Sequence, residues 1–415
     1  MSDADVNAAR RQAQIRVAGF DPPRPVMEFA HMGLDKAMMG AIAKQGYTKP
    51  TPIQCQAIPA ALSGRDVLGI AKTGSGKTAA FLIPMMVHIM DQPELNRGEG
   101  PIAVIAAPTR ELAQQIHQEG RKFAKPYKVG VAGVFGGMNK QDQYKELKAG
   151  VEVVVCTPGR LIDWMKNKTI TMRRTTFLVL DECDRMFDMG FEPQVRSIVG
   201  QIRPDRQTLL FSATMPNKIH RMASDALSNP VRVTVGVTGD ANEDIKQLVE
   251  VLANEETKWP WLAPRLPRFV DEGDVLIFCG RKEKVEEVEK KIGESDFRVA
   301  CLHGDKDQAS RMDVLKKFKE GHFHVLVATD VAARGLDIKS IKTVINFDAA
   351  RDMDTHVHRI GRTGRAGDKD GTAYTLLTEK EGRFAAELVG NLVAAGQEVP
   401  RSLHDLALTN KGFRG

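Results

Sequence analysis

The sequence alternates short apolar runs with longer amphipathic segments, and this alternation occurs twice along its 415 residues. Runs that are short and almost unbroken are typical of parallel strands buried on both faces. The first set comprises residues 66–71, 102–108, 151–158, 177–182 and 208–214, and the second comprises residues 274–280, 298–304, 324–330, 342–348 and 371–377. We therefore predict an α/β fold with two doubly wound parallel-sheet domains in tandem, in which helices connect the strands.

Domain borders follow from where the two sets of runs begin and end. The polar segment GVTGDANED (236–244) separates them and predicts an interdomain linker. We expect one domain at 26–235 and the other at 245–398, with ligands in a cleft at the carboxyl ends of the strands. Residues 1–25 are predicted to form a poorly packed N-terminal extension, and residues 399–415 a C-terminal tail.

Composition narrows the class of protein. The chain is 42% hydrophobic and 27% charged, which is typical of soluble globular enzymes and binding proteins. Its net charge of +6 is compatible with a polyanionic partner but decides nothing alone. The five cysteines are widely spaced without a C-x-x-C pair, so they favour a reducing compartment over a disulfide framework or a zinc site. The chain starts without an apolar signal segment and has no membrane-spanning run, so we expect a soluble protein without membrane contact.

The segment AKTGSGKT (71–78) follows the first apolar run and precedes a helical stretch. This order is typical of a phosphate-binding loop, in which Lys77 reaches the terminal phosphates and the Thr78 hydroxyl contacts Mg²⁺. The residues whose backbone would surround the phosphates are Thr73, Gly74, Ser75 and Gly76. A glycine-rich turn without a ligand is the alternative, but it does not require the Lys-Thr pair.

Three carboxylates lie within four positions in the segment LDECD (180–184). Asp181, Glu182 and Asp184 would repel one another unless they share a cation or a proton. On a strand neighbouring the phosphate loop, Asp181 would bind Mg²⁺ and Glu182 would deprotonate the attacking water. Asp184 is then predicted to form a hydrogen bond with the SAT motif (212–214). An acidic helix N-terminus is the alternative, which explains one or two carboxylates but not the accompanying phosphate loop.

Together with these motifs, an ordered set of others resembles the DEAD-box RNA helicases of superfamily 2, from about Ile15 to about Thr378. The further motifs are GYTKPTPIQ (46–54), PTREL (108–112), GG (136–137), TPGR (157–160), LIFC (276–279), HGDKDQASR (303–311), ATDVAARGLDI (328–338) and HRIGRTGR (358–365). The resemblance implies two RecA-like domains, ATP and Mg²⁺ as cofactors, and an RNA-dependent ATPase activity.

The resemblance also assigns residues to ATP. It implies that Gln54 reads the adenine edge, that Phe29 packs on the base, and that Asp330 contacts the ribose. Phe29 owes this assignment to its spacing of seventeen positions before Gly46, since by itself it would be a core residue. Arg362 and Arg365 resemble arginine fingers for the γ-phosphate, and their spacing of three would place them on one face of a helix. The residues implied to couple hydrolysis to the second domain are Asp184, Ser212, Thr214 and His358.

RNA contacts are implied for small, hydroxyl-bearing or arginine residues beside glycines. They are Arg110, Gly137, Thr157 and Arg160 in the first domain, and Gly304, Arg311 and Thr329 in the second. Such groups suit phosphates and 2′-hydroxyls, so binding should tolerate any sequence and weaken with salt. Taken alone, any one of these arginines would more often form a surface salt bridge than a ligand contact.

Cys183 stands where the family usually has alanine, a spelling shared with a branch associated with mRNA export. The flanking segments 15–29 and 187–216 instead resemble nuclear, splicing-associated members, so we expect mRNA processing in the nucleus, with the cytoplasm as the alternative. We interpret Cys183 as a buried apolar-like residue, with a redox sensor as the alternative.

The expected activity is that of a monomer that closes on ATP and single-stranded RNA. It would unwind short duplexes or remodel ribonucleoprotein and reopen after hydrolysis, with activating or ribonucleoprotein partners as candidates. An ATP-gated RNA clamp that serves as an assembly factor is the alternative. A DNA translocase is disfavoured by the Gln54 motif and by HRIGRTGR.

Overall fold

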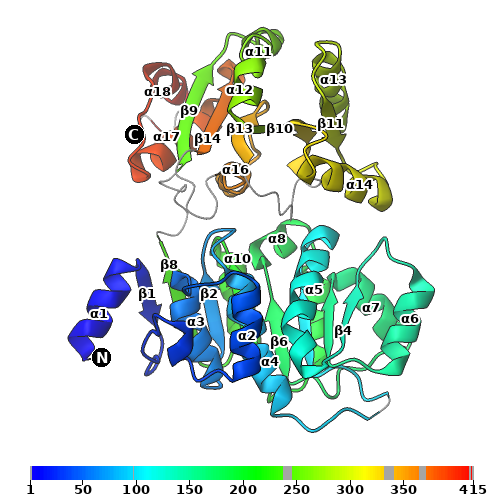
Figure 1. Cartoon of the computed structure of the whole chain (residues 1–415). Helices are drawn as coiled ribbons and strands as arrows, with labels where there is room; N and C mark the ends of the chain where they lie inside the picture. The colour runs from blue at the N-terminus through cyan, green and yellow to red at the C-terminus, as the bar shows by residue number, and fades with distance from the viewer. Residues whose placement is uncertain are drawn as a thin grey trace. The chain divides into compact units, whose positions relative to one another are not determined.

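The computed structural model describes residues 2–96, 98–236, 245–330, 341–363, 371–410 and 413. The chain divides into two compact units, Met1–Thr238 and Gly239–Gly415 (Figure 1). The predicted linker (236–244) lies outside the described residues except for Gly236, and so does Arg365. No helix in the described ranges is long and apolar enough to cross a membrane.

The first unit is built on one sheet, which has eight strands within the described residues. In spatial order they are β1 (Ile15–Ala18), β8 (Val231–Val235), β2 (Val67–Ile70), β7 (Gln207–Ser212), β6 (Phe177–Leu180), β3 (Ala103–Ala106), β5 (Val153–Cys156) and β4 (Val131–Val134). All neighbouring strands are parallel except β1, which runs antiparallel to β8. The carboxyl ends of seven strands therefore lie at one edge of the sheet.

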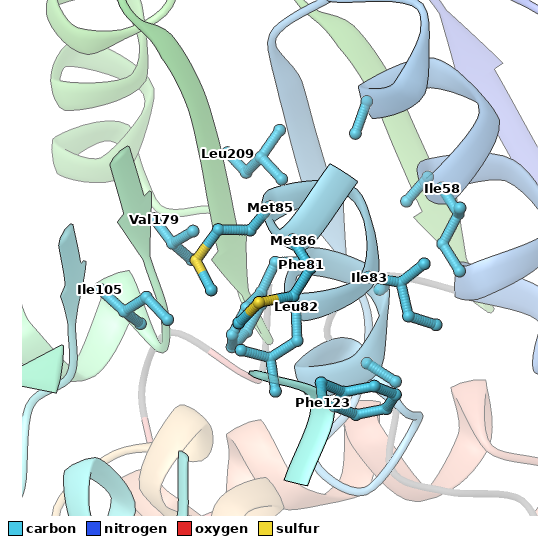
Figure 2. Packing of buried hydrophobic residues seen from close by; sticks show 14 of the residues in the cluster. Ile58, Phe81, Leu82, Ile83, Met85, Met86, Ile105, Phe123, Val179 and Leu209 are labelled. Carbon is cyan, nitrogen blue, oxygen red and sulfur yellow. The ribbon is translucent and has the colours of Figure 1, made fainter. Parts of the chain in front are cut away.

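Helices cover both faces of this sheet. They are α1 (Asp3–Gln12), α2 (Lys36–Lys44), α3 (Pro52–Leu62), α4 (Lys77–Met90), α5 (Arg110–Ala124), α6 (Lys140–Ala149), α7 (Pro158–Lys166), α8 (Cys183–Asp188), α9 (Glu192–Gln201) and α10 (Asn217–Ala226), with short 3₁₀ turns η1 (Phe29–His31) and η2 (Lys125–Tyr127). Helices α2 to α5 pack on one face and α6 to α10 on the other, each with its own hydrophobic cluster. Figure 2 shows Met85 of the buried helix α4 close to Val179 of β6 and Leu209 of β7.

The five apolar runs predicted for the first domain form β2, β3, β5, β6 and β7, which confirms them as buried parallel strands. Strands β1, β4 and β8 were not predicted from the sequence. Strand β4 is only VAGV, and its glycine shortens the apolar signal. Strand β8 (VRVTV) contains Arg232 and Thr234 between its valines, so it is not an unbroken apolar run.

The prediction of a poorly packed N-terminal extension is wrong for β1, although most residues of 2–25 are exposed. Strand β1 pairs with β8 from Ile15 opposite Val235 to Ala18 opposite Arg232. The Arg10 guanidinium donates hydrogen bonds to the Gln56 side chain and to the Pro23 carbonyl. The segment therefore covers an edge of the sheet. Strand β1 has only four residues, which is too short to be recognised in the sequence.

The second unit holds a parallel sheet of six strands within its described part. In spatial order they are β11 (Val299–Leu302), β12 (Val325–Ala328), β10 (Asp274–Phe278), β13 (Ile341–Asn346), β14 (Gly371–Leu377) and β9 (Ile245–Val251). Its helices are α11 (Lys258–Leu262), α12 (Leu266–Glu272), α13 (Lys282–Gly293), α14 (Gln308–Lys319), α16 (Met353–Ile360), α17 (Gly382–Ala394) and α18 (Arg401–Ala407), with 3₁₀ turns η3 (Glu255–Thr257) and η4 (Glu379–Glu381). All five predicted runs are confirmed as strands.

The C-terminal tail prediction is wrong for α18. Leu403 is fully buried and Leu406 is nearly so, and both belong to a cluster with Leu388 and Leu392 of α17. Two leucines three positions apart supply an apolar face too short to be noticed in the sequence.

Candidate nucleotide and RNA sites

The loop between β2 and α4 folds around its own lysine. Gly74 and Gly76 have φ values of +78° and +90°, a conformation that side chains disfavour. Lys77 begins α4 and is buried, and its Nζ donates to the carbonyls of Ala71 at 2.7 Å and Lys72 at 3.3 Å. The Ser75 hydroxyl oxygen is buried without a hydrogen-bond partner in the described structure. The N-terminal amides of α4 and an ammonium group thus meet in one loop, as phosphate binding requires.

The N-terminus of α3 is tied to this loop. Thr51 Oγ1 donates to the Ser75 carbonyl at 2.8 Å, and Gln54 Nε2 donates to the Gly76 carbonyl at 2.9 Å. The Thr51 amide in turn donates to Gln54 Oε1 at 3.0 Å. A Cβ at Gly76 would lie 2.6 Å from Gln54 Nε2, so this contact requires a glycine. The amide group predicted to read adenine is therefore fixed against the phosphate loop.

Phe29 lies in η1, is 4% exposed and belongs to the first hydrophobic cluster. The structure gives it a core position. Its role in packing on a nucleotide base stays a prediction.

Asp181 directly follows β6 and is buried. One of its oxygens accepts the Glu182 amide at 2.9 Å. Burial raises the pKa of the Asp181 carboxyl to about 7, and the Lys77 charge opposes this rise. The prediction that this strand neighbours β2 is wrong by one position, because β7 lies between β2 and β6. The carboxylate still ends at the same sheet edge as the phosphate loop.

Glu182 has a left-handed backbone, with φ +50° and ψ +51°. A non-glycine residue in this conformation stores strain, and such residues cluster at functional sites. Its carboxylate pairs with Arg185 Nε at 3.6 Å, and both side chains are buried. The backbone strain and the ion pair together fix where the Glu182 side chain points.

The predicted contact between Asp184 and the SAT motif is confirmed. Asp184 Oδ2 accepts three hydrogen bonds, from the Thr214 amide at 2.9 Å, the Thr214 hydroxyl at 3.0 Å and the Ala213 amide at 3.2 Å. The Asp184 amide donates to Ser212 Oγ at 3.3 Å. The ends of β6 and β7 are therefore joined by charge-assisted hydrogen bonds.

Cys183 is fully buried in the second hydrophobic cluster. Burial, together with the neighbouring Asp184 and Asp181 carboxylates, raises the pKa of its thiol well above the ordinary value. The thiol stays protonated and shielded, which supports the apolar interpretation and disfavours a redox sensor.

A magnesium site was predicted at Thr78 and Asp181. The described residues contain no cluster of three or more His, Cys, Asp or Glu side chains that could hold a metal. Mg²⁺ bound together with nucleotide needs fewer protein ligands, because waters and phosphate oxygens complete its shell. Asp181 interacts electrostatically with Lys77, and Thr78 follows Lys77 in the first turn of α4. A carboxylate and a hydroxyl at this sheet edge fit the donor set.

The first-domain residues predicted to bind RNA follow β3, β4 and β5, which lie side by side. Arg110 begins α5, and a Cβ at Gly136 would lie 2.6 Å from its Cζ, so its guanidinium rests against the GG backbone. Thr157 precedes α7 and makes no capping bond with its side chain. Arg160 Nη1 is buried without a hydrogen-bond partner in the described structure. The fold therefore brings these groups to one sheet edge, with donor capacity left over.

In the second unit, Gly304 follows β11 and Thr329 follows β12, so they too lie at a carboxyl sheet edge. Gly304 is exposed, and the Thr329 amide donates to the Leu302 carbonyl at 3.1 Å. Arg311 lies in α14, which follows the loop of Gly304.

Arg359 is a buried arginine of the HRIGRTGR motif for which no role was predicted. It is 2% exposed and donates to both carboxylate oxygens of Asp330, at 2.6 and 2.9 Å. It also donates to the Asp348 carbonyl at 2.6 Å and lies 5.2 Å from the centre of the Phe278 ring. Asp330, which the family resemblance assigned to contact the ribose, is thus the partner of a buried arginine. The signal was present in HRIGRTGR, which contains three arginines for two predicted fingers.

The prediction that Arg362 lies on a helix is wrong. Helix α16 ends at Ile360, with Gly361 as its C-cap, and Arg362 occupies the following turn. Arg362 is 3% exposed and its Nε donates to the His358 carbonyl at 3.3 Å. His358 itself is buried in the last turn of α16. Arg365 lies outside the described residues, so its position relative to Arg362 stays a prediction.

Two α/β units, the first with a phosphate loop and a buried acidic cluster at the same sheet edge, define a RecA-like nucleotide-dependent protein. The family model for the DEAD/DEAH box helicase matches residues 51–222, and the helicase conserved C-terminal domain matches residues 262–367. The chain belongs to the DEAD-box RNA helicase family.

Three known proteins illustrate the relationship. The DEAD-box ATP-dependent RNA helicase 24 of Oryza sativa subsp. japonica is 66% identical over 414 residues, which are 100% of this chain and 54% of that protein. The crystal structure of the yeast DEAD-box splicing factor Prp28 shares 32% identity and a TM-score of 0.57, covering 98% of this chain and 94% of the other. S. cerevisiae Dbp5 bound to RNA and ADP BeF3 shares 28% identity and a TM-score of 0.78, covering 93% and 98%. The chain thus spans about half the length of its curated relative.

Proposed function

We propose that this chain is the core of an ATP-dependent RNA helicase that binds ATP on its first unit, closes on single-stranded RNA and reopens after hydrolysis. One observation carries the proposal. The phosphate loop, the buried acidic cluster, the SAT motif and the RNA motifs of the first unit all lie at the carboxyl edge of one sheet. ATP and RNA bound there would be linked through shared strands, so that each affects the affinity for the other.

Hydrolysis would use the residues of this edge. Gln54 and Phe29 hold the base, and Lys77 and the amides of the loop hold the phosphates. Thr78 and Asp181 hold Mg²⁺, which when bound neutralises charge on the phosphates. Glu182, positioned by Arg185 at 3.6 Å, accepts the proton of the attacking water.

The second unit would complete the site when it closes. Arg362 and Arg365 would stabilise the charge on the γ-phosphate, and His358 would contact the neighbourhood of Asp184 and Ser212. The Asp184–Thr214 bonds support this coupling, since they tie the acidic cluster to the end of the next strand.

RNA would be held by its backbone in both units, so that binding tolerates any sequence. We propose a monomer, with activating or ribonucleoprotein partners supplied by the cell. A place in mRNA processing in the nucleus is supported by the likeness to a protein named as a splicing factor.

ATP hydrolysis by the purified chain, measured with and without single-stranded RNA, tests the proposal. We expect RNA to raise the turnover of ATP hydrolysis, and we expect Lys77→Ala to abolish hydrolysis with or without RNA. A turnover that RNA leaves unchanged would contradict the proposal. Release of short duplexes in the same samples separates a helicase from an RNA clamp, because a clamp would hydrolyse slowly and stay bound.

A further inference from the structure

The surface of α6 and α7 carries an aromatic pair beside a cation. The ring centres of Tyr144 and Trp164 are 6.3 Å apart and the rings are inclined by 43°. Lys148 Nζ lies 5.9 Å from the centre of the Tyr144 ring. Tyr144 is 47% exposed, whereas Leu147 supplies the buried contact of this polar helix. The tyrosine ring is therefore not needed to anchor α6, which lies beside α7 at the β4 end of the sheet (Figure 1).

A buried glutamine holds the pair in place. Gln143 is 1% exposed, and its Oε1 accepts a hydrogen bond from Trp164 Nε1 at 3.1 Å. Its Nε2 donates to the Phe135 carbonyl at 2.9 Å, directly before Gly136. The indole orientation is thus fixed relative to the GG motif. A rigid surface loses little conformational entropy when it binds a ligand.

The aromatic pair continues the candidate RNA surface. Arg160 and Trp164 are four positions apart on α7 and are therefore neighbours on one helix face. The buried Nη1 of Arg160, which has no hydrogen-bond partner in the described structure, needs an acceptor. A phosphate oxygen is the acceptor that a guanidinium prefers, and the next base along the strand would then lie near the indole.

Charge favours a polyanion on this surface. Residues 140–168 contain five lysines and Arg160 against four carboxylates. One of these carboxylates, Glu152, already accepts the Gly130 amide at 2.6 Å. Aromatic rings interleaved with cations suit single-stranded nucleic acid, because each base offers a face for stacking and each phosphate a charge.

We propose that Tyr144 and Trp164, together with Lys148 and Arg160, form a stacking platform for a nucleotide of single-stranded RNA beyond those bound by the RNA motifs. This inference rests on the proposed function and extends its substrate to longer RNA. The platform takes any base, because stacking does not read hydrogen-bonding edges.

Binding of two RNAs to the full chain tests the platform. One RNA has about 6 nucleotides, near the lower end of the usual site size of single-strand binders, and the other has about 20, beyond its upper end. Tyr144→Ala weakens binding of the longer RNA by about five- to tenfold, the lower end of the effect of one stacked base, and leaves binding of the shorter RNA unchanged. Tyr144→Phe retains the ring and binds both RNAs like the wild type. Phe20→Ala is the matched control, because Phe20 is an exposed aromatic residue, at 75%, elsewhere on the same unit.

Photo-cross-linking of the longer RNA with 5-bromouracil adds a direct readout, with a cross-link expected in the peptide containing Tyr144 or Trp164. Equal binding by Tyr144→Ala, or an equal loss for both RNAs, would overturn the platform. If the short RNA still stimulates ATP hydrolysis in that case, the proposed function stands and the surface belongs to a protein partner or to solvent. If RNA stimulates no hydrolysis even in the wild type, both proposals fail.

Discussion

The two aspartates of the DECD segment should affect stability in opposite directions when each is replaced by asparagine. Asp181 is buried, and the pKa of its carboxyl rises from an ordinary 3.8 to about 7 in the folded chain. One pKa unit corresponds to about 1.4 kcal/mol, so the ionised carboxylate destabilises the folded state by up to about 4 kcal/mol. Asp184, in contrast, accepts three hydrogen bonds on one oxygen.

The pH dependence has a definite sign. A carboxyl whose pKa is raised by folding costs no stability below about pH 4, where it is protonated in both states. The cost grows as the pH rises towards 7 and is constant above it. Asp181→Asn should therefore match the wild type near pH 4 and be more stable by about 2 to 4 kcal/mol at pH 8, in the absence of Mg²⁺ and nucleotide. Asp184→Asn should be less stable by about 2 to 3 kcal/mol, because the neutral amide loses the charge that strengthens the bonds to Oδ2. Its NH₂ group also cannot accept the Arg185 amide, which Asp184 Oδ1 accepts at 3.0 Å.

Urea unfolding at several pH values, read by brief amide exchange in peptides from β6 and β7, measures both variants in the intact chain. This readout reports the first unit separately from the second. Adding Mg-ATP should stabilise the wild type but not Asp181→Asn, because the variant lacks the metal ligand. Two results would refute the reasoning. Asp181→Asn could be less stable than the wild type at pH 8, or its stability relative to the wild type could be the same at every pH.

Two further predictions concern nucleotide selectivity and the buried ion pair. Gln54→Ala should narrow the ratio of kcat/KM for ATP over GTP by about tenfold, since a fixed amide edge is lost, and an unchanged ratio would contradict the assignment. Asp330→Asn should lower kcat while preserving the KM ratio of ATP to 2′-deoxy-ATP, because Asp330 holds Arg359 through bonds of 2.6 and 2.9 Å. A change in that KM ratio alone would instead support the ribose contact.

Local chemistry was sufficient to predict several parts of the site. The phosphate loop was identified because strand, glycines, Lys77 and helix follow one another without interruption. The Asp184 contact was predicted because a surplus carboxylate and the SAT motif end two successive apolar runs, which the structure shows as neighbouring strands.

Long-range order could not be predicted in the same way. The insertion of β7 between β2 and β6 is a property of the whole sheet, and no single segment encodes it. Gly361 ends α16, and a glycine after the last apolar residue of a helix is a stronger signal than the spacing of two arginines. Arg359 was missed because its partner, Asp330, lies 29 residues away and its role depends on that contact.

The central claim is that hydrolysis, carried out by Glu182, reopens a chain closed on ATP and RNA. Its most direct test is the dissociation rate of single-stranded RNA from Glu182→Gln and from the wild type, measured with ATP and Mg²⁺. Glutamine retains the size and hydrogen bonding of the side chain but cannot accept the proton of the attacking water. The account predicts that the variant binds ATP, fails to hydrolyse it and holds RNA longer than the wild type does. An RNA lifetime on Glu182→Gln equal to or shorter than that on the wild type would contradict it.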